Sequence, residues 1–279
     1  MRRTLTTITL IAAALTSLPL LAQDVNPDRV TVSWSDPSKP GLLKVRLIQG
    51  GITVKTHSGP DVIIEAKSSG RNNARPAPTG GVGGLRRIDS NTTGLRVEEA
   101  NNVMTVGTSS LSRQCCSNIE IQVPTKTNLN LSALNGGDII VDGVEGELEV
   151  TNMNGGVELD NVAGSVVAHS LNGGVTVSLR QASSDKAMSF TSMNGNVDVT
   201  LPANTKANLK MRTDLGEIYS DFEVKLMPNN TQPTVEDTRR RGGRYRIELN
   251  KNTTGTINGG GPDFGLRTLN GNIFIRKGK

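Results

Sequence analysis

The chain has 279 residues, of which 35% are hydrophobic and only 3% aromatic, and its formal net charge is +5. Such a composition argues against a large compact globule with an aromatic core and favours a narrow core of small β-branched side chains. The charge is too small to indicate a nucleic-acid-binding protein.

Residues 1–22 have the layout of a secretory signal peptide. Met1-Arg2-Arg3 gives a basic start, a largely apolar run without charge extends from Leu5 to Ala22, and polar Gln23-Asp24 follow. Thr and Pro dilute this run below a good membrane-spanning helix, so a retained anchor is the weaker alternative. Its removal lowers the formal charge to +3. We expect an exported mature chain that is periplasmic, at the outer surface or extracellular.

The segment 23–42 is expected to be an irregular cap, because it contains three prolines and lacks alternation. Its Trp34, the single tryptophan of the chain, is a candidate to close one end of an elongated core. Alternating apolar and polar residues begin at Leu43 and predict a β-domain over 43–279. A glycine-rich stretch without periodicity, at about 71–94, is expected to be an insertion.

The two cysteines, Cys115 and Cys116, are adjacent in the chain. Exported proteins often pair their cysteines, but adjacent Cα atoms lie closer than a relaxed disulfide prefers. A vicinal disulfide, two free thiols and a bond to another chain are therefore all open alternatives. Neither histidine is close in sequence, so we expect no metal here and no cofactor elsewhere.

A short phrase recurs between residues 131 and 201 at a period near twenty. Its asparagines are 19, 18 and 22 residues apart, and an alternating apolar strand follows each copy. Such a period predicts stacked repeats. The copies are Leu134-Asn135-Gly136-Gly137, Met153-Asn154-Gly155-Gly156, Leu171-Asn172-Gly173-Gly174 and Met193-Asn194-Gly195-Asn196.

The repeat predicts an all-β parallel solenoid with rungs of about 18–22 residues and two short strands in each rung. Asn-Gly is also the strongest hairpin signal, which makes an antiparallel meander the rival architecture. The same residue types recur in the same columns, as in Val157, Val175, Val197 and Ile273. Stacked rungs explain this recurrence, because like side chains then lie about 4.8 Å apart, whereas hairpins do not require it.

We interpret the repeated phrase as the set of residues that form the corner of each rung. We expect each Asn-Gly pair to form a left-handed corner, the asparagines to form a hydrogen-bonded ladder, and the preceding Leu or Met to fill the core. Substituting Val for Gly155 or Gly173 should then destabilise the fold, since a β-branched residue opposes positive φ. The expected corner residues are Asn135, Gly136, Asn154, Gly155, Asn172, Gly173, Asn194, Gly195, Gly216, Asn270 and Gly271.

The C-terminal part contains a degenerate copy, an insertion and a last copy. The asparagine is missing before Gly216, a polar insertion covers about 228–243, and Asn270-Gly271 restores the phrase. Arg239-Arg240-Arg241 in the insertion is a basic cluster that would suit anionic envelope polymers, lipid headgroups or nucleic acid, although a solvated loop is the preferred interpretation. The final strand, 273–275, has little chain left to cover it, so edge-to-edge self-association is a further hypothesis.

Three passages resemble the DUF4097-type adhesin family, bacterial β-helical domains of unknown function. They are Ile121–Pro124 leading into Leu131–Val141, Val199–Asn204 leading into Thr213–Ile218, and Gly265–Ile273. The resemblance covers roughly 50–276 and implies a β-solenoid with an adhesin-like surface. The family supplies no catalytic residues to carry over.

The sequence allows one alternative in which the chain is an enzyme. A polysaccharide-acting β-helix would need clustered carboxylates, and Glu158 and Asp198 share an outward column two rungs, or about 9.6 Å, apart. His169 falls in a rung column with Thr151 and Thr191, so a structural or solvent-facing role is expected for it, and His57 lies in a turn with no nucleophile signature nearby.

The function expected from the sequence is therefore non-enzymatic. The chain would act as a structural or adhesin-like binding surface in the cell envelope, with an envelope polymer, a glycan or a protein as partner. We expect no nucleic acid partner and no transmembrane segment in the mature chain.

Overall fold

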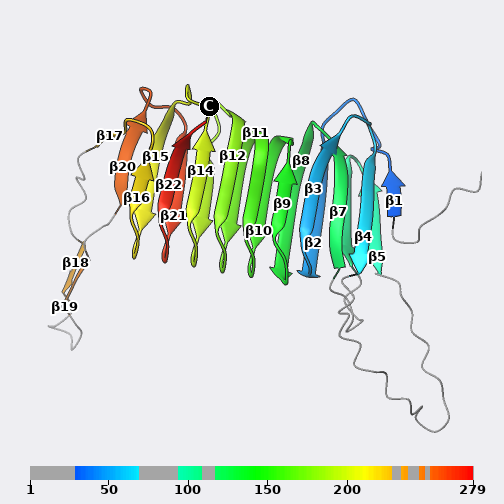
Figure 1. The fold of residues 1–279 in the computed structure, drawn as a ribbon, viewed down its shortest axis with the longest axis horizontal. Coiled ribbons are helices and arrows are strands. Elements are labelled where there is room, and N and C mark those ends of the chain that lie inside the picture. Colours follow the sequence, from blue (N-terminus) through cyan, green and yellow to red (C-terminus); the bar gives the residue numbers. More distant parts are fainter. Residues whose placement is uncertain are drawn as a thin grey trace, which may run out of the picture.

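The computed structural model describes residues 29–68, 94–108, 117–227, 234–237, 245–248 and 252–278, and every regular element in these ranges is a β-strand (Figure 1). The prediction of an all-β fold is confirmed. No helix in these ranges is long and apolar enough to span a membrane. The segment 1–22, both cysteines and Arg239-Arg240-Arg241 lie outside the described residues.

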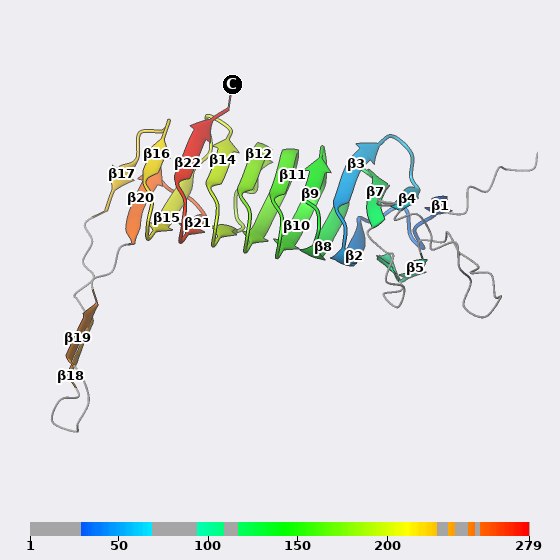
Figure 2. The same cartoon turned by 60° about the horizontal axis from the view of Figure 1, so that its bottom comes forward.

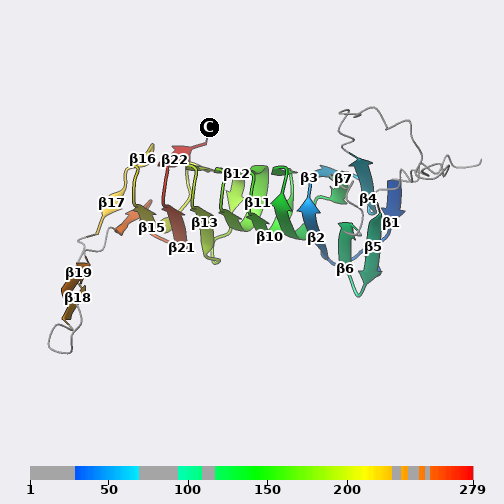
Figure 3. The same cartoon turned by 90° about the horizontal axis from the view of Figure 1, so that it is seen from below.

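The strands form two walls that face each other across a narrow core (Figures 2 and 3). The first wall contains, in spatial order, β5 (Leu95–Ala100), β6 (Val103–Thr108), β2 (Gly41–Gln49), β8 (Thr127–Asn135), β10 (Glu145–Asn152), the second half of β11 (Val157–Ser170), β13 (Met188–Ser192), β21 (Asp263–Thr268), β15 (Ala207–Thr213), β20 (Thr253–Ile257) and β17 (Lys225–Leu226).

The second wall runs alongside the first and is joined to it through β11, whose halves belong to different walls. A separate hairpin joins β18 (Thr234–Asp237) to β19 (Tyr245–Glu248). The second wall contains, in order, β1 (Arg29–Val32), β4 (Val62–Ser68), β7 (Ser117–Pro124), β3 (Ile52–His57), β9 (Ile139–Asp142), the first half of β11, β12 (Val175–Ala182), β14 (Val197–Leu201), β22 (Ile273–Lys277) and β16 (Ile218–Ser220).

The sheet is mixed, so the prediction of a parallel solenoid holds only in part. Pairings in the middle of the stack are parallel, and antiparallel pairings occur only towards its ends: β1–β4, β4–β7 and β5–β6 at one end, β15–β20 and β17–β20 at the other. The pairing of β16 with β22, at the end of the second wall, is parallel. A short turn at Asn101 and Asn102 joins β5 to β6, whereas the partners in the other antiparallel pairs of the two walls are far apart in the sequence.

The spatial order of the rungs differs from their order in the sequence at both ends. The early pair β2–β3 lies between β8–β9 and β6–β7. The late pair β21–β22 lies between β13–β14 and β15–β16. The final strand β22 is thus paired along both edges, which overturns the prediction that residues 273–275 form an open edge. The outer strand at this end of the second wall is β16.

The core consists of aligned columns of small apolar side chains. One column crosses the second wall and is buried from Ile119 to Ile273. Parallel register places like residues on successive rungs, as predicted for the valines that follow each phrase. Each buried aliphatic side chain contributes roughly 1.5–3 kcal/mol. The column is Ile119, Ile52, Ile139, Val157, Val175, Val197 and Ile273.

The glycines of the phrase are required mainly by close contact between rungs. Positive φ occurs at Gly136 (93°) and Gly271 (156°), but not at Gly155, Gly173, Gly195 or the five asparagines, so the left-handed corner prediction is wrong for most copies. A Cβ at Gly173 would lie 2.3 Å from the carbonyl oxygen of Gly155. The same clash, at 1.9–2.5 Å, recurs at Gly155, Gly195, Gly216 and Gly271.

Two hydrogen-bonded ladders follow this corner. On the outside, four asparagine amides each donate to the asparagine of the preceding rung at 2.6–2.8 Å: Asn154 to Asn135, Asn172 to Asn154, Asn194 to Asn172 and Asn270 to Asn194. On the inside, Ser170, Ser192, Thr213 and Thr268 donate to glycine carbonyl oxygens at 2.8–2.9 Å. The inner ladder satisfies carbonyl groups that would otherwise be buried without partners.

The Leu or Met before each asparagine does not fill the core, contrary to the sequence-based interpretation. The inward positions of β8 are Leu129, Leu131 and Ala133, and Leu134 therefore points outward. Met153 and Met193 are likewise 44% exposed. Trp34 does lie in the core, 6% exposed, where its ring covers Gly41.

Candidate binding groove

Three adjoining depressions form a groove along the corner opposite the asparagine ladder. Their volumes are about 410, 670 and 650 Å³. The first and second share Ser183, and the second and third share Arg180, Pro202 and Asn204. Their continuity gives a long shallow site that crosses several rungs.

Loops and one irregular strand create these depressions. Strand β11 changes wall with register shifts between Leu159 and Ala163, and Asn161 adopts φ 52° there. Asparagine tolerates this left-handed backbone better than most residues. The turn after β14 begins at Pro202, which lacks a backbone N–H, and includes Asn204. The corner is therefore less regular than the asparagine corner and leaves space between successive turns.

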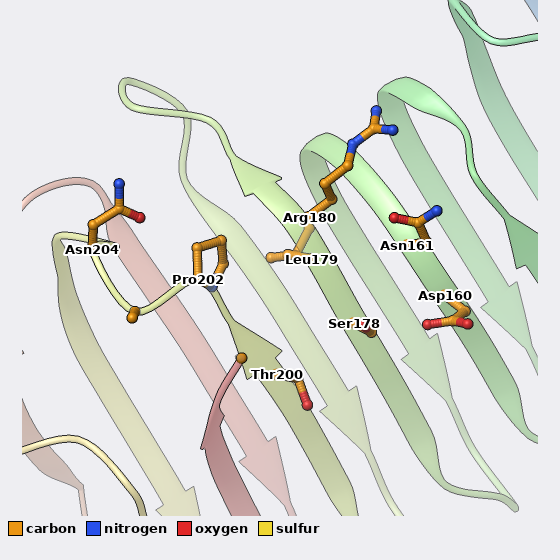
Figure 4. Close-up of a pocket in the computed structure, with 10 residues that line it drawn as sticks. Asp160, Asn161, Ser178, Leu179, Arg180, Thr200, Pro202 and Asn204 are labelled. Carbon is orange, nitrogen blue, oxygen red and sulfur yellow. The ribbon is translucent and has the colours of Figure 1, made fainter.

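Polar groups dominate the third depression (Figure 4). Ser178 and Thr200 are paired residues on neighbouring strands β12 and β14. Asp160 lies on the adjacent strand, and the Arg180 side chain extends from the end of β12 (Figure 4). Hydroxyl, amide, carboxylate and guanidinium groups thus alternate along the groove, a set that can exchange hydrogen bonds with a polar chain.

Charges of both signs line the groove. Arg180 lies 3.7 Å from Glu145, and Lys186 pairs with Glu147. The hydrogen bond from Lys186 to Glu147 raises the pKa of this lysine above its ordinary value. Among the described residues, Lys126 and Lys206 form no ion pair, although both line the groove. The groove therefore offers two uncommitted cations and one loosely paired arginine.

The carboxylates of the enzyme alternative share a column, but Asp198 is engaged. Glu158 pairs with Thr176, which pairs with Asp198, so the two acids are two rungs apart. Arg276 donates to both oxygens of Asp198, with Nε–Oδ distances of 2.8 and 3.0 Å. This contact raises the pKa of Arg276 and holds the carboxylate in a bidentate pair. The two acids therefore do not form a free acid–base pair.

Both histidines lie in strands of the two walls, His57 at the end of β3 and His169 in β11. His57 Nδ1 accepts from the Gly59 N–H at 3.1 Å, so Nε2 carries the proton and donates to the Asp61 carbonyl at 2.7 Å. His169 lies between Thr151 and Thr191 in its wall. Within the described ranges, no group of three His, Cys, Asp or Glu side chains is arranged to hold a metal ion.

Comparison with known proteins identifies the family. The family described as Toastrack DUF4097 matches residues 43–258, which is more than half of the chain. The chain belongs to this family. The Toastrack assignment confirms the resemblance found in the sequence.

Two solved structures are similar to this Toastrack chain. One is a candidate cell adhesion protein from Clostridium sporogenes, with 10% identity, a TM-score of 0.44, and coverage of 90% of this chain and 99% of that one. The other is a candidate adhesin from Bacteroides fragilis, with 12% identity, a TM-score of 0.29, and coverage of 89% and 95%. No curated protein matches the chain.

Sequence reasoning missed the groove of this Toastrack domain. Arg180, Pro202 and Asn204 lie at the second, weaker turn of successive repeats and share no common motif. Their proximity depends on the irregular path of β11 and on loops of unequal length. The sequence contained one indication of the groove: the second turn of each repeat recurs at a similar position, and parallel stacking brings these turns to a common edge.

Proposed function

We propose that this protein is a non-enzymatic binding protein of the cell envelope, whose corner groove holds an extended polar polymer such as an envelope glycan. The proposal includes export directed by residues 1–22 and a site in the periplasm, at the outer surface or outside the cell. The continuous groove carries this proposal, because three depressions in line suit a chain of repeating units better than a compact metabolite.

The chemistry of the groove supports a polar ligand. Ser178 and Thr200 can donate or accept hydrogen bonds, and the amides of Asn161 and Asn204 can do both at once. Arg180, Lys126 and Lys206 favour a polymer that carries carboxylate or phosphate groups. The described residues that line the groove include no aromatic side chain, so hydrogen bonds and charge would provide most of the affinity.

The test measures binding of the chain from residue 23 onward to a panel of neutral and anionic envelope polysaccharides by isothermal titration calorimetry. Arg180→Ala with Asn204→Ala should weaken binding to the best polymer at least tenfold. Arg96→Ala is the matched control, because Arg96 also pairs with one glutamate, Glu98, but lies in β5 at the far end. Equal loss in both variants, or no binding at all, would contradict the proposal.

A further inference from the structure

A row of apolar side chains follows the asparagine corner on the outer face of the first wall. The strand register aligns the residues that immediately precede the ladder asparagines. Ile48 of β2 belongs to the same row, because the next residue, Gln49, pairs with Asn135. Five of the six are at least 36% exposed, and Leu171 is half-buried. This apolar stripe is Ile48 (52%), Leu134 (36%), Met153 (44%), Leu171, Met193 (44%) and Leu269 (37%).

The stripe differs from the other outward columns. The adjacent column on the same wall is polar throughout and reads Arg46, Ser132, Thr151, His169, Thr191 and Arg267. Outward strand positions next to solvent are normally polar, as that column is. Six unbroken apolar positions on successive rungs therefore indicate a surface that is covered by something else.

We propose that a second copy of this chain packs along the apolar stripe, so that two solenoids lie side by side. The stripe repeats every 4.8 Å or so and is about 24 Å long over its five steps. A second copy has the same repeat and can place one Leu or Met against each rung, as in the dry interfaces between stacked strands. An irregular surface would match only some of the six positions.

Charge determines the relative direction of the two copies. In an antiparallel pair, the polar columns would face each other and bring Arg46 of one copy opposite Arg267 of the other. In a parallel pair, related by a twofold axis along the stripe, each polar column faces the neutral asparagine ladder of the other copy. The parallel arrangement avoids the like-charge contact and places Arg46 and Arg267 opposite the neutral amides of Gln49 and Asn270.

The size of the surface predicts a weak dimer. The stripe with its two flanking columns covers roughly 500 Å² on each chain, or roughly 1,000 Å² in total, which is near the lower limit for a specific interface. Association is therefore expected to depend on protein concentration. The groove lies on the opposite corner and stays open in this dimer.

Sedimentation velocity of the chain from residue 23 onward, over a range of concentrations, tests the proposal. The wild-type chain should shift from monomer to dimer, and Met153→Lys with Leu171→Lys should stay monomeric, with at least a tenfold rise in dissociation constant. Thr176→Lys is the control, because it adds a charge at an exposed position of the other wall. Melting curves of each variant verify that the fold is retained.

Disulfide trapping tests the direction. In a background with Cys115→Ser and Cys116→Ser, Leu134→Cys should cross-link to its own copy under mild oxidation, because a parallel dimer places the two residues 134 together. Cross-linking only between Leu134→Cys and Met193→Cys chains would establish the antiparallel pair and overturn the parallel one. A wild-type chain that stays monomeric, or binds phosphatidylglycerol vesicles through the stripe instead, would overturn the dimer.

Discussion

Gly173 is the position where contact between rungs can be tested most directly. A Cβ there would lie 2.3 Å from the Gly155 carbonyl oxygen and 2.5 Å from its carbonyl carbon. These are backbone atoms of the next rung, and they cannot rotate away as a side-chain tip would. Ordinary contact begins near 3.4 Å, so the Gly173→Ala chain must separate the two rungs by about 1 Å at this corner.

This separation affects the hydrogen bonds on both sides of the glycine. The Asn172 N–H donates to the Met153 carbonyl at 3.0 Å, and the Ser192 hydroxyl donates to the Gly173 carbonyl at 2.8 Å. Overpacking typically costs about 1–3 kcal/mol, and because the neighbouring backbone is rigid we expect a cost of about 3 kcal/mol for Gly173→Ala. For a domain of this size the melting temperature should fall by roughly 6–12 °C.

The adjacent Gly174 provides the control. Its added Cβ would approach no described atom closer than 3.4 Å, from the Asn196 carbonyl oxygen, and it does not have positive φ. Urea and thermal denaturation of both alanine variants should show a loss for Gly173→Ala and almost none for Gly174→Ala. Equal stability of the two variants would refute the close-contact explanation of the glycine column.

Three further predictions concern the ladders and one loop. Ser192→Ala should cost about 1–3 kcal/mol, because the half-buried Gly173 carbonyl loses its donor; an unchanged urea midpoint would contradict this. Asn172→Ala removes two ladder hydrogen bonds and Asn270→Ala one, so the measured losses should be about 2 and about 1 kcal/mol. Hydrogen bonds from Ser38, followed by Lys39, lower the pKa of Asp36 from 3.8 to about 2. A carboxyl group whose pKa is lower in the folded state stabilises the fold at pH values above its unfolded pKa. The contribution of Asp36 to folding stability is therefore complete above about pH 4 and is lost as pH falls through about 2. The difference in melting temperature between wild type and Asp36→Asn should therefore shrink as pH falls from about 4 to below about 2, and a constant difference would contradict this prediction.

The repeat in the sequence predicted the central part of the fold, because the order of the rungs in space there is the same as their order in the chain. Val157, Val175 and Val197 stack as their common position indicated. Strand alternation would also have placed Leu134 outside, since Leu131 and Ala133 point inward. The sequence-based interpretation placed Leu134 in the core because leucine is usually buried. The alternation of inward and outward positions along the strand gave the correct placement.

The ends of the fold and the groove depend on information that a repeat does not contain. The degenerate copy at Leu215-Gly216 precedes the intact copy at Asn270-Gly271 in the chain, yet Asn270 stacks directly on Asn194. Insertion of the late rung keeps the asparagine ladder continuous and moves Leu215, which cannot extend it, to the end. Local sequence preference cannot reveal such an exchange, because it depends on a contact between Asn194 and Asn270, which are 76 residues apart in the chain.

The interior position of β21 and β22 also affects how the chain acquires its structure during synthesis. Residues 263–277 are synthesised after β13 to β16. Until β21 and β22 are made, their position between the β13–β14 rung and the β15–β16 rung is unoccupied. The contact from Asn194 to Asn270 spans 76 residues, a long loop to close before the core is sealed. The C-terminal third therefore remains open until its last strands arrive, and a prematurely terminated chain would expose unpaired strand edges in the middle of the stack.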